Sequence, residues 1–127
     1  MCGNPPPETA SVMQRGDIWY VDLEPSRASE ANKTRPAVIV SNDRANATAS
    51  RLGRGVISVV PVTSNVDRVY PFQVLLQAPD SGLAVASKAQ AEQVRSIAAQ
   101  RLIRRIGRVS ARELAELDDA LRLHLAL

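Results

Sequence analysis

The chain has a single histidine, His124, and this scarcity excludes the acid–base chemistry of many nucleases and hydrolases. A nuclease that uses two histidines as acid and base cannot be built within one such chain. A Ser–His–Asp or Cys–His hydrolase would need His124 beside a nucleophile. His124 instead lies near the end of a helical pattern, where the helix dipole favours a basic side chain. We therefore expect it to be an exposed helix residue.

Cysteine and long apolar runs are also scarce. The lone Cys2 excludes an internal disulfide and a cysteine-rich zinc site, and it fits a reducing cytosol. No run of about eighteen apolar residues is present, so the sequence predicts no membrane span. The first residues lack the basic region and apolar core of a secretory signal. These features together predict a cytoplasmic protein.

The acidic residues do not converge in the way that a metal site requires. Asp118 and Asp119 are neighbours on a predicted helix and point in different directions. Asp17 and Asp22 fall on opposite faces of a predicted strand. No Walker motif and no glycine-rich dinucleotide fingerprint is present. The sequence therefore predicts neither a metal site nor another cofactor.

Arginine, by contrast, is abundant. Of the 16 basic residues only Lys33 and Lys88 are lysines, and the net charge is +3. A guanidinium group matches two phosphate oxygens at once. Arginine, hydroxyls and a few isolated acids suit metal-free RNA cleavage, in which the substrate's own 2′-hydroxyl attacks the adjacent phosphate.

Residues 33–43 join a polar loop to a short buried strand. Residues 38–40 (Val-Ile-Val) are typical of a strand covered on both faces. Pro36 favours extended geometry at Arg35, so the strand is expected to begin just after the proline, with Arg35 at its mouth. A guanidinium fixed there could hold a phosphate. The alternative, on local sequence alone, is a solvated or ion-paired strand-end arginine.

The rest of the chain predicts one mainly β domain. Residues 1–12 are expected to be a disordered N-terminal extension, and 13–127 the folded domain. Pro61 indicates an edge position or a bulge in its strand, and Gly107 a bulge or kink in another. β-forming residues predict further strands over 17–23, 56–62, 69–76 and 101–109.

Helical signals are fewer. Residues 44–55 read as irregular, with at most one helical turn, and 83–95 fit helix and strand equally well. Ser110 and Glu113 form a capping box at the start of a C-terminal helix. A leucine stripe follows and predicts that this helix covers the sheet, through Leu114, Leu117, Leu121 and Leu125. Together these predicted strands and helices indicate a small, strongly bent sheet or barrel with appended helices.

Several short sequence blocks occur in a fixed order along the chain. They are RGDIW at 15–19, LEP at 23–25, Ser29-Glu30, residues 33–43, VPVTS at 60–64 and QVRSI at 93–97. Together these blocks resemble the MazF/PemK family of toxin endoribonucleases. The resemblance covers residues 13–127, and it makes strand the expected structure for 83–97.

The resemblance implies a mainly β fold: a small SH3-like, strongly bent β-barrel with an appended C-terminal helix, working as a homodimer. It implies the toxin of a toxin–antitoxin pair, which cleaves single-stranded RNA (mRNA) sequence-specifically and without metal. The expected products are 2′,3′-cyclic phosphate and 5′-hydroxyl ends. A cognate antitoxin is expected to place an acidic tail in the RNA groove.

The resemblance also implies site residues. The arginine before the proline and the threonine that ends the third strand are catalytic in this family, and they match Arg35 and Thr63. The general base stays open, with Glu30 chemically able to serve. The loop before the second strand departs from the family at Ala28, where glycine is frequent. The expected RNA-binding residues are Ser29, Glu30, Asn32, Lys33, Thr34 and Ser64.

Two other functions fit the residues less well. A toxin on the same scaffold could resemble the CcdB branch, binding DNA gyrase without chemistry of its own. Such a binder has no need of Arg35 and Thr63. A nucleic-acid-binding module could use the basic run 95–112 as a phosphate track. The plainer interpretation of that run is a solvated strand face with contacts at a dimer edge.

Overall fold

The computed structural model describes residues 13–23, 34–78 and 80–127. The expected N-terminal extension, 1–12, therefore lies outside the described residues. The strands are β1 (Asp17–Asp22), β2 (Thr34–Ile39), β3 (Val56–Thr63), β4 (Gln73–Leu76), β5 (Ser87–Gln90), β6 (Arg95–Ala98) and β7 (Leu102–Arg108). The helices are α2 (Asp43–Leu52) and α3 (Ala111–Leu125), and two short 3-10 helices are η1 (Ala91–Gln93) and η2 (Ala99–Arg101).

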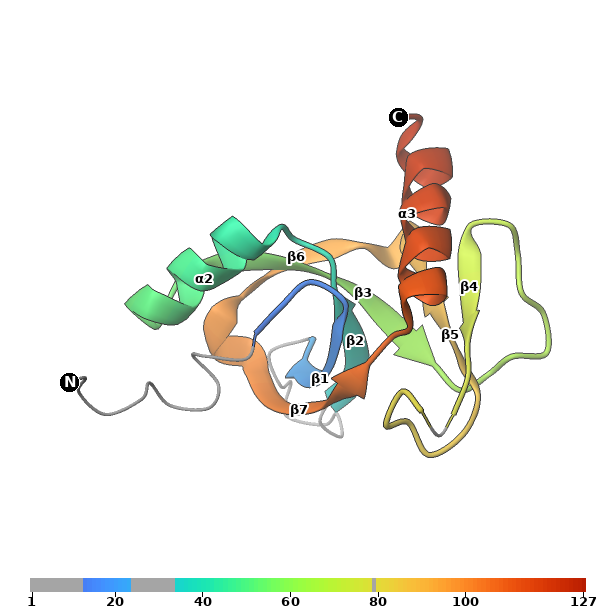
Figure 1. Ribbon diagram of the computed structural model, residues 1–127, viewed down its shortest axis with the longest axis horizontal. Helices are drawn as coiled ribbons and strands as arrows, with labels where there is room; N and C mark the ends of the chain where they lie inside the picture. Colours follow the sequence, from blue (N-terminus) through green and yellow to red (C-terminus); the bar gives the residue numbers. More distant parts are fainter. Residues whose placement is uncertain (1–12, 24–33, 79) are drawn as a thin grey trace, which may run out of the picture.

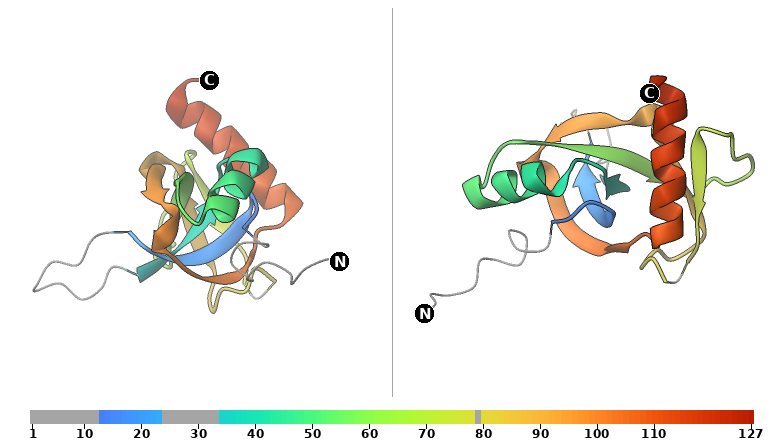
Figure 2. Two further views of the ribbon diagram at one scale, coloured as in Figure 1. Left: turned by 90° about the vertical axis from the view of Figure 1, so that its left-hand side faces the viewer. Right: turned by 45° about the horizontal axis from the view of Figure 1, so that its top comes forward.

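The strands pair antiparallel in a seven-stranded sheet of order β4-β5-β3-β2-β1-β7, with β6 beside β3. The sheet is strongly bent, as both views in Figure 2 show. Over the described ranges its pairing does not close into a complete barrel. The predicted fold class, mainly β with a C-terminal helix, is confirmed.

β3 lies at the centre of the sheet, so of the two positions predicted from Pro61, an edge strand or a bulge, the edge strand is wrong. β3 pairs with β2 on one side; on the other it pairs with β6 over 56–59 and with β5 at Val62 and Thr63. Pro61 lies in the interval where β3 changes from one partner to the other. A residue without an N–H is tolerated there because that interval has no strand partner on that side.

β2 begins at Thr34, so the prediction that the strand starts after Pro36 is also wrong. Residues 34–36 pair with β1, whereas the pairing with β3 begins only at Ala37. Pro36 therefore lies where β2 has a single neighbour, which tolerates proline as an edge does. Arg35 is the second residue of the strand rather than a loop residue at its mouth.

Helix α2 replaces the irregular segment expected over 44–55. The Asn42 side chain caps it by accepting a hydrogen bond from the Ala45 N–H at 2.8 Å. Gly53 ends it in the left-handed conformation, with φ 67°. Asn46 is buried and donates to the Ser41 carbonyl at 2.9 Å, which ties the helix to the end of β2. The cap, the alanines and the terminal glycine were all present in the sequence.

Helix α3 begins with the predicted capping box, since Ser110 accepts from the Glu113 N–H and Glu113 accepts from the Ser110 N–H. Leu117 is fully buried, but Leu125 is 49% exposed, so only the first part of the leucine stripe is covered. The helix packs on β4 and η1. Figure 1 shows α3 at the end of the molecule that holds β4 and β5, with α2 at the other end beside β6.

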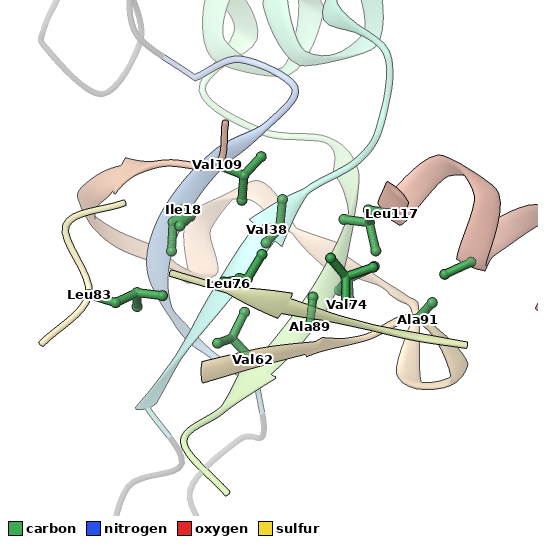
Figure 3. Close-up of a cluster of buried hydrophobic side chains, with 12 residues drawn as sticks. Ile18, Val38, Val62, Val74, Leu76, Leu83, Ala89, Ala91, Val109 and Leu117 are labelled. Carbon is green, nitrogen blue, oxygen red and sulfur yellow. The ribbon is translucent and has the colours of Figure 1, made fainter. Parts of the chain in front are cut away.

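The bent sheet buries apolar side chains on both faces. One cluster contains Ile18, Val38, Val62 and Leu117, and it is drawn in Figure 3. The other contains Trp19 and residues that alternate with the first set, namely Val21, Leu23, Ala37, Ile39, Ile57 and Val59. Because strand side chains alternate between faces, β1 and β2 contribute to both clusters. The site therefore rests on strands fixed from two sides.

The remaining strand predictions hold in part. The segment 83–97 contains β5 and β6, as the resemblance implied. The strand expected over 69–76 covers only β4, and 70–73 form a turn closed by the Gln73 N–H and the Tyr70 carbonyl at 2.8 Å. Gly107 lies at the predicted bulge, where the β1–β7 register shifts. A Cβ there would lie 1.9 Å from the Ser81 carbonyl oxygen, so the approach requires glycine.

Candidate active site

Strands β2 and β3 bring Arg35 and Thr63 to opposite positions. Ala37 pairs with Pro61, Val38 with Val60 and Ile39 with Val59. Continuing this register by two residues places Arg35 opposite Thr63. Opposed residues on antiparallel strands extend from the same face of the sheet and lie close together. Residues 28 positions apart in the sequence thus lie at adjoining ends of β2 and β3, two residues beyond the last pair, Ala37 and Pro61.

A groove of about 260 Å³ opens at this end of the two strands. It is lined by Arg35, Thr63 and Ser64, and also by Tyr20, Pro36, Val62, Leu83, Ala84, Val85 and Ser87. The two predicted catalytic residues and one predicted RNA-binding residue therefore share one groove. Thr34 begins β2 opposite Asp22 and does not line the groove. The other predicted RNA-binding residues, Ser29, Glu30, Asn32 and Lys33, lie outside the described residues.

The Arg35 side chain is exposed. Among the described residues, no hydrogen bond or ion pair to its guanidinium is found. The guanidinium carries five N–H donors in a planar fork. Within this part of the chain those donors remain available to an anion in the groove, and a phosphate matches their geometry.

The Thr63 hydroxyl has one defined contact. Its oxygen accepts a hydrogen bond from the Asn65 N–H at 3.2 Å. A hydroxyl group accepts through its lone pairs and donates through its hydrogen. The contact with Asn65 uses a lone pair, so the hydroxyl hydrogen can be donated to an oxygen atom in the groove.

The groove contains residues that the sequence reasoning missed. Tyr20 is half-buried in its wall, and the Arg104 guanidinium carbon lies 4.6 Å from the centre of the Tyr20 ring. A cation at that distance is attracted by the electron-rich ring face. Leu83, Ala84 and Val85 come from the segment before β5, whose approach no local pattern reveals. The available signal for Tyr20 was its place on the strand face opposite Trp19, next to the polar loop.

The basic run 95–112 is largely engaged with β1. Arg105 and Arg108 contact the buried Asp17 carboxylate at 3.4 and 2.9 Å. Arg101 donates to the Asp22 carbonyl at 3.3 Å, and Arg104 covers Tyr20. These four arginines therefore fasten β7 and η2 to β1 rather than lining a continuous open track.

Larger hollows lie elsewhere, and several of their charged groups already have partners within the protein. One of about 410 Å³ includes Arg108, which pairs with Asp17, and Glu113, which caps α3 and accepts from the Gln77 N–H. Another of about 470 Å³ lies between β4 and α3, where Asp119 pairs with Arg122. Neither combines an unengaged guanidinium with a hydroxyl. Three or more metal-ligating side chains do not gather anywhere in the described residues.

Helix α3 contains the single histidine of the chain. His124 is exposed near its end, as predicted from the helix dipole. None of the helices in the described residues has the length and apolar character needed to cross a membrane.

The family comparison can now be set beside this geometry. The family model described as "PemK-like, MazF-like toxin of type II toxin-antitoxin system" matches residues 14–125. This chain belongs to that family. The matched span includes the groove, all seven strands and both long helices. The resemblance drawn from the sequence blocks is confirmed.

Curated relatives of this PemK-like, MazF-like toxin are endoribonucleases by name. The chain is 72% identical to endoribonuclease MazF9 of Mycobacterium tuberculosis over 116 residues, which cover 91% of this chain and 98% of the relative. It is 31% identical to endoribonuclease EndoA of Bacillus subtilis, over 91% of this chain and 97% of the relative. The prediction of a toxin endoribonuclease is confirmed, and a gyrase-binding toxin of the CcdB type is not favoured.

Solved structures of the family share the fold. A MazE–MazF crystal structure from Deinococcus radiodurans matches with a TM-score of 0.72 and 26% identity, covering 91% of this chain and 97% of that one. An endoribonuclease in complex with its cognate antitoxin, from a mycobacterial species, matches with a TM-score of 0.70 at 22% identity, covering 91% and 96%. The second likeness concerns the fold alone.

Proposed function

We propose that this toxin cleaves single-stranded RNA without a metal ion, by attack of the substrate's 2′-hydroxyl, with Arg35 and Thr63 as catalytic residues. The observation that supports the proposal is the groove that gathers Arg35, Thr63 and Ser64 in a member of this toxin family. Its reactive groups are a guanidinium and hydroxyls, which can bind and stabilise a phosphate.

Arg35 clamps the scissile phosphate. Its planar fork donates to two phosphate oxygens at once, and the pair of hydrogen bonds fixes the phosphate in the groove. Negative charge grows on these oxygens as the 2′-oxygen approaches, so the guanidinium binds the transition state more strongly than the ground state. Arg35 does not serve as the general base, because its guanidinium stays protonated and has no acceptor for a proton.

Thr63 directs its hydroxyl hydrogen to a phosphate oxygen or to the 2′-oxygen, since its own oxygen already accepts from Asn65. Ser64, exposed beside it, contributes to binding the RNA chain. Thr34 and the loop residues Ser29, Glu30, Asn32 and Lys33 are proposed to contact RNA as well. The loop thereby selects the bases to be cut.

The cleavage step requires neither water nor an oxidant. The bond between phosphorus and the 2′-oxygen forms while the bond between phosphorus and the 5′-oxygen breaks. The 2′-hydroxyl proton leaves to a base, and the departing 5′-oxygen gains a proton. The products are a 2′,3′-cyclic phosphate and a 5′-hydroxyl, which distinguish this reaction from metal-assisted hydrolysis.

The proposal extends to the toxin's assembly and location. Residues 13–127 act as one toxin domain, and two copies form a homodimer. A cognate antitoxin binds the RNA groove with an acidic segment, which competes with RNA for the guanidinium donors of Arg35. A cytoplasmic location follows from the RNA substrate.

A cleavage assay with a long defined RNA in EDTA tests the proposal. Discrete cuts with 5′-hydroxyl and 2′,3′-cyclic phosphate ends are expected. Cuts with 5′-phosphate ends, or cuts that appear only when a divalent metal is restored, would contradict the mechanism. A folded, antitoxin-free protein that leaves RNA of diverse sequence intact would contradict the function.

A further inference from the structure

Lys88 on β5 is a buried cation in an unusual place. It is 8% exposed, although lysine is seldom buried without a partner. Two other buried charged residues have clear structural partners, because Asp17 pairs with arginines and Glu113 caps α3. In the described residues no carboxylate lies within ion-pairing distance of Lys88. A buried ammonium group needs such compensation, so its other contacts become informative.

Strand register places Lys88 beside the active site. Lys88 pairs with Thr63 on β3 and with Leu75 on β4. The next residue, Ala89, pairs with Val62 and Val74, and these three lie in one buried cluster. Successive strand residues extend to alternate faces of the sheet. Lys88 and Thr63 therefore share one face, and it is opposite to the face of that buried cluster.

The Lys88 ammonium group contacts the loop 64–72, which follows Thr63. Its Nζ donates to the Arg68 carbonyl at 2.5 Å and lies 5.9 Å from the centre of the Tyr70 ring. The Tyr70 ring stacks on Phe72, with the ring centres 5.4 Å apart. The carbonyl and the ring face thus supply partial negative charge in place of a carboxylate.

The same loop holds groups of the active site. Ser64 lines the groove, and the Asn65 N–H donates to the Thr63 hydroxyl at 3.2 Å. Lys88 therefore fastens the far part of a loop whose first residues orient the Thr63 hydroxyl. It does not line the groove itself.

We propose that Lys88 is a positioning residue for RNA cleavage, which holds the loop 64–72 so that Asn65 directs the Thr63 hydroxyl toward the substrate. The proposal rests on the proposed function of the groove. It assigns to a buried lysine on β5 a part in a reaction that takes place between β2 and β3. A direct phosphate contact is a different role and makes different predictions.

The test compares Lys88→Met with Lys88→Arg in the full chain. Met keeps the apolar stem and removes the charge, while Arg keeps a cation that can reach a carbonyl and a ring face. For Lys88→Met we expect the cleavage rate at saturating RNA to fall about tenfold, because small misplacements of catalytic groups are costly. KM and the salt dependence should stay within about twofold of the parent, since no phosphate contact is lost. Lys88→Arg should recover most of the rate.

Arg51→Met serves as the matched control. It removes one positive charge from the end of α2, which Figure 1 places far from β5. We expect its rate, KM and salt dependence to match the parent. A parental rate in Lys88→Met, or a raised KM with a smaller salt slope and no change in rate, would overturn the positioning role.

A second readout does not depend on cleavage. The amide resonance of Asn65 should shift in Lys88→Met, return toward its parental position in Lys88→Arg and stay unchanged in Arg51→Met. An unchanged Asn65 resonance in Lys88→Met overturns the proposal. An inactive parent protein contradicts the proposed function instead, and the amide result still decides whether Lys88 holds the loop.

Stability separates this role from a purely structural one. Burial of an ammonium group without a carboxylate costs solvation energy, and this gain on removing the charge offsets the lost hydrogen bond to the Arg68 carbonyl, so Lys88→Met should melt near the parental temperature. If this variant fails to fold, Tyr70→Leu removes the ring that faces the ammonium group. It should lower the rate about twofold and shift the Asn65 resonance, because the cation–ring contact is weaker than the hydrogen bond. A parental rate and an unshifted resonance in Tyr70→Leu would overturn the proposal.

Discussion

The arginines of β7 and Arg35 of β2 lie on the two strands that flank β1, and they differ in what their guanidinium groups contact. On β7, Arg105 and Arg108 reach the buried carboxylate of Asp17, whose second oxygen accepts from the Gln14 N–H at 2.9 Å. On β2, Arg35 is exposed in a groove, and among the described residues no partner for its guanidinium is found.

The difference shows that an arginine's neighbours decide its role. A guanidinium paired with a buried carboxylate stabilises the sheet, because separating the pair would leave a buried charge without compensation. An unengaged guanidinium keeps its donors for a ligand. The basic run 95–112 is the more conspicuous feature of the sequence, yet Arg35 is the arginine that lines the groove with Thr63.

Removal of Arg35 should have the largest effect. We expect Arg35→Ala to lower the RNA cleavage rate by about 10²–10³-fold, the usual loss when a group that stabilises transition-state charge is removed. Its melting temperature should stay near that of the parent, because the side chain is exposed. Arg35→Lys should fall between the two, since an ammonium group cannot donate from a planar fork. Equal rates in Arg35→Ala and the parent would contradict the catalytic assignment.

Removal of the Asp17 carboxylate should affect folding instead. We expect Asp17→Asn to lower the free energy of unfolding by about 2–3 kcal/mol, because it weakens charge-assisted hydrogen bonds at a buried site. The rate per folded molecule should remain parental. Denaturant titration combined with active-site-normalised rates measures both quantities. A stable but inactive Asp17→Asn protein would place this cluster in the catalytic machinery and remove the contrast with Arg35.

Thr63→Val should lower the cleavage rate about tenfold, because one hydrogen bond to a charged phosphate contributes about 1.5 kcal/mol or more. Valine keeps the size and β-branching suited to the end of β3. Thr63→Ser retains the hydroxyl and should recover much of the rate. Single-turnover rates on one RNA make the comparison, and a fully active valine variant would leave Thr63 with a structural role only.

Removal of Arg104 should have the smallest effect. This arginine belongs to β7, and its guanidinium covers the ring of Tyr20, a residue of the groove wall, but Arg104 itself does not line the groove. We expect Arg104→Ala to change the cleavage rate by about twofold, as the loss of one exposed cation–ring contact implies. A loss as large as that of Arg35→Ala would show that the basic run takes part in catalysis after all.

Much of the fold followed from local signals. The capping box at Ser110 and Glu113 and the alternation of Trp19 and Val21 are interactions over a few residues, and both appear in the structure. The start of β2 at Thr34 and the central position of β3 could not be predicted from local signals. Proline disfavours a strand only where a ladder partner needs its N–H, and the partners of Pro36 and Pro61 are set by distant strands.

The candidate site divides in the same way. Arg35 and Thr63 were predicted as catalytic because their sequence blocks match a known family, and both line the same groove. Tyr20 and Leu83 were missed as groove residues because their approach depends on how the sheet bends. Helix α2 could have been predicted, because its cap at Asn42 and its end at Gly53 are visible in the sequence. The interpretation of residues 44–55 as irregular overlooked both signals.

The most direct test of this account is a side-by-side measurement of single-turnover RNA cleavage by Arg35→Ala and Arg108→Ala, each normalised to its folded fraction. Each variant removes one arginine, so the change in net charge is the same. The account predicts a loss of about a hundredfold or more for Arg35→Ala and a rate within about twofold of the parent for Arg108→Ala. Equal losses in the two variants would contradict it, because the chemistry would then depend on positive charge in general and not on the arginine that lines the groove.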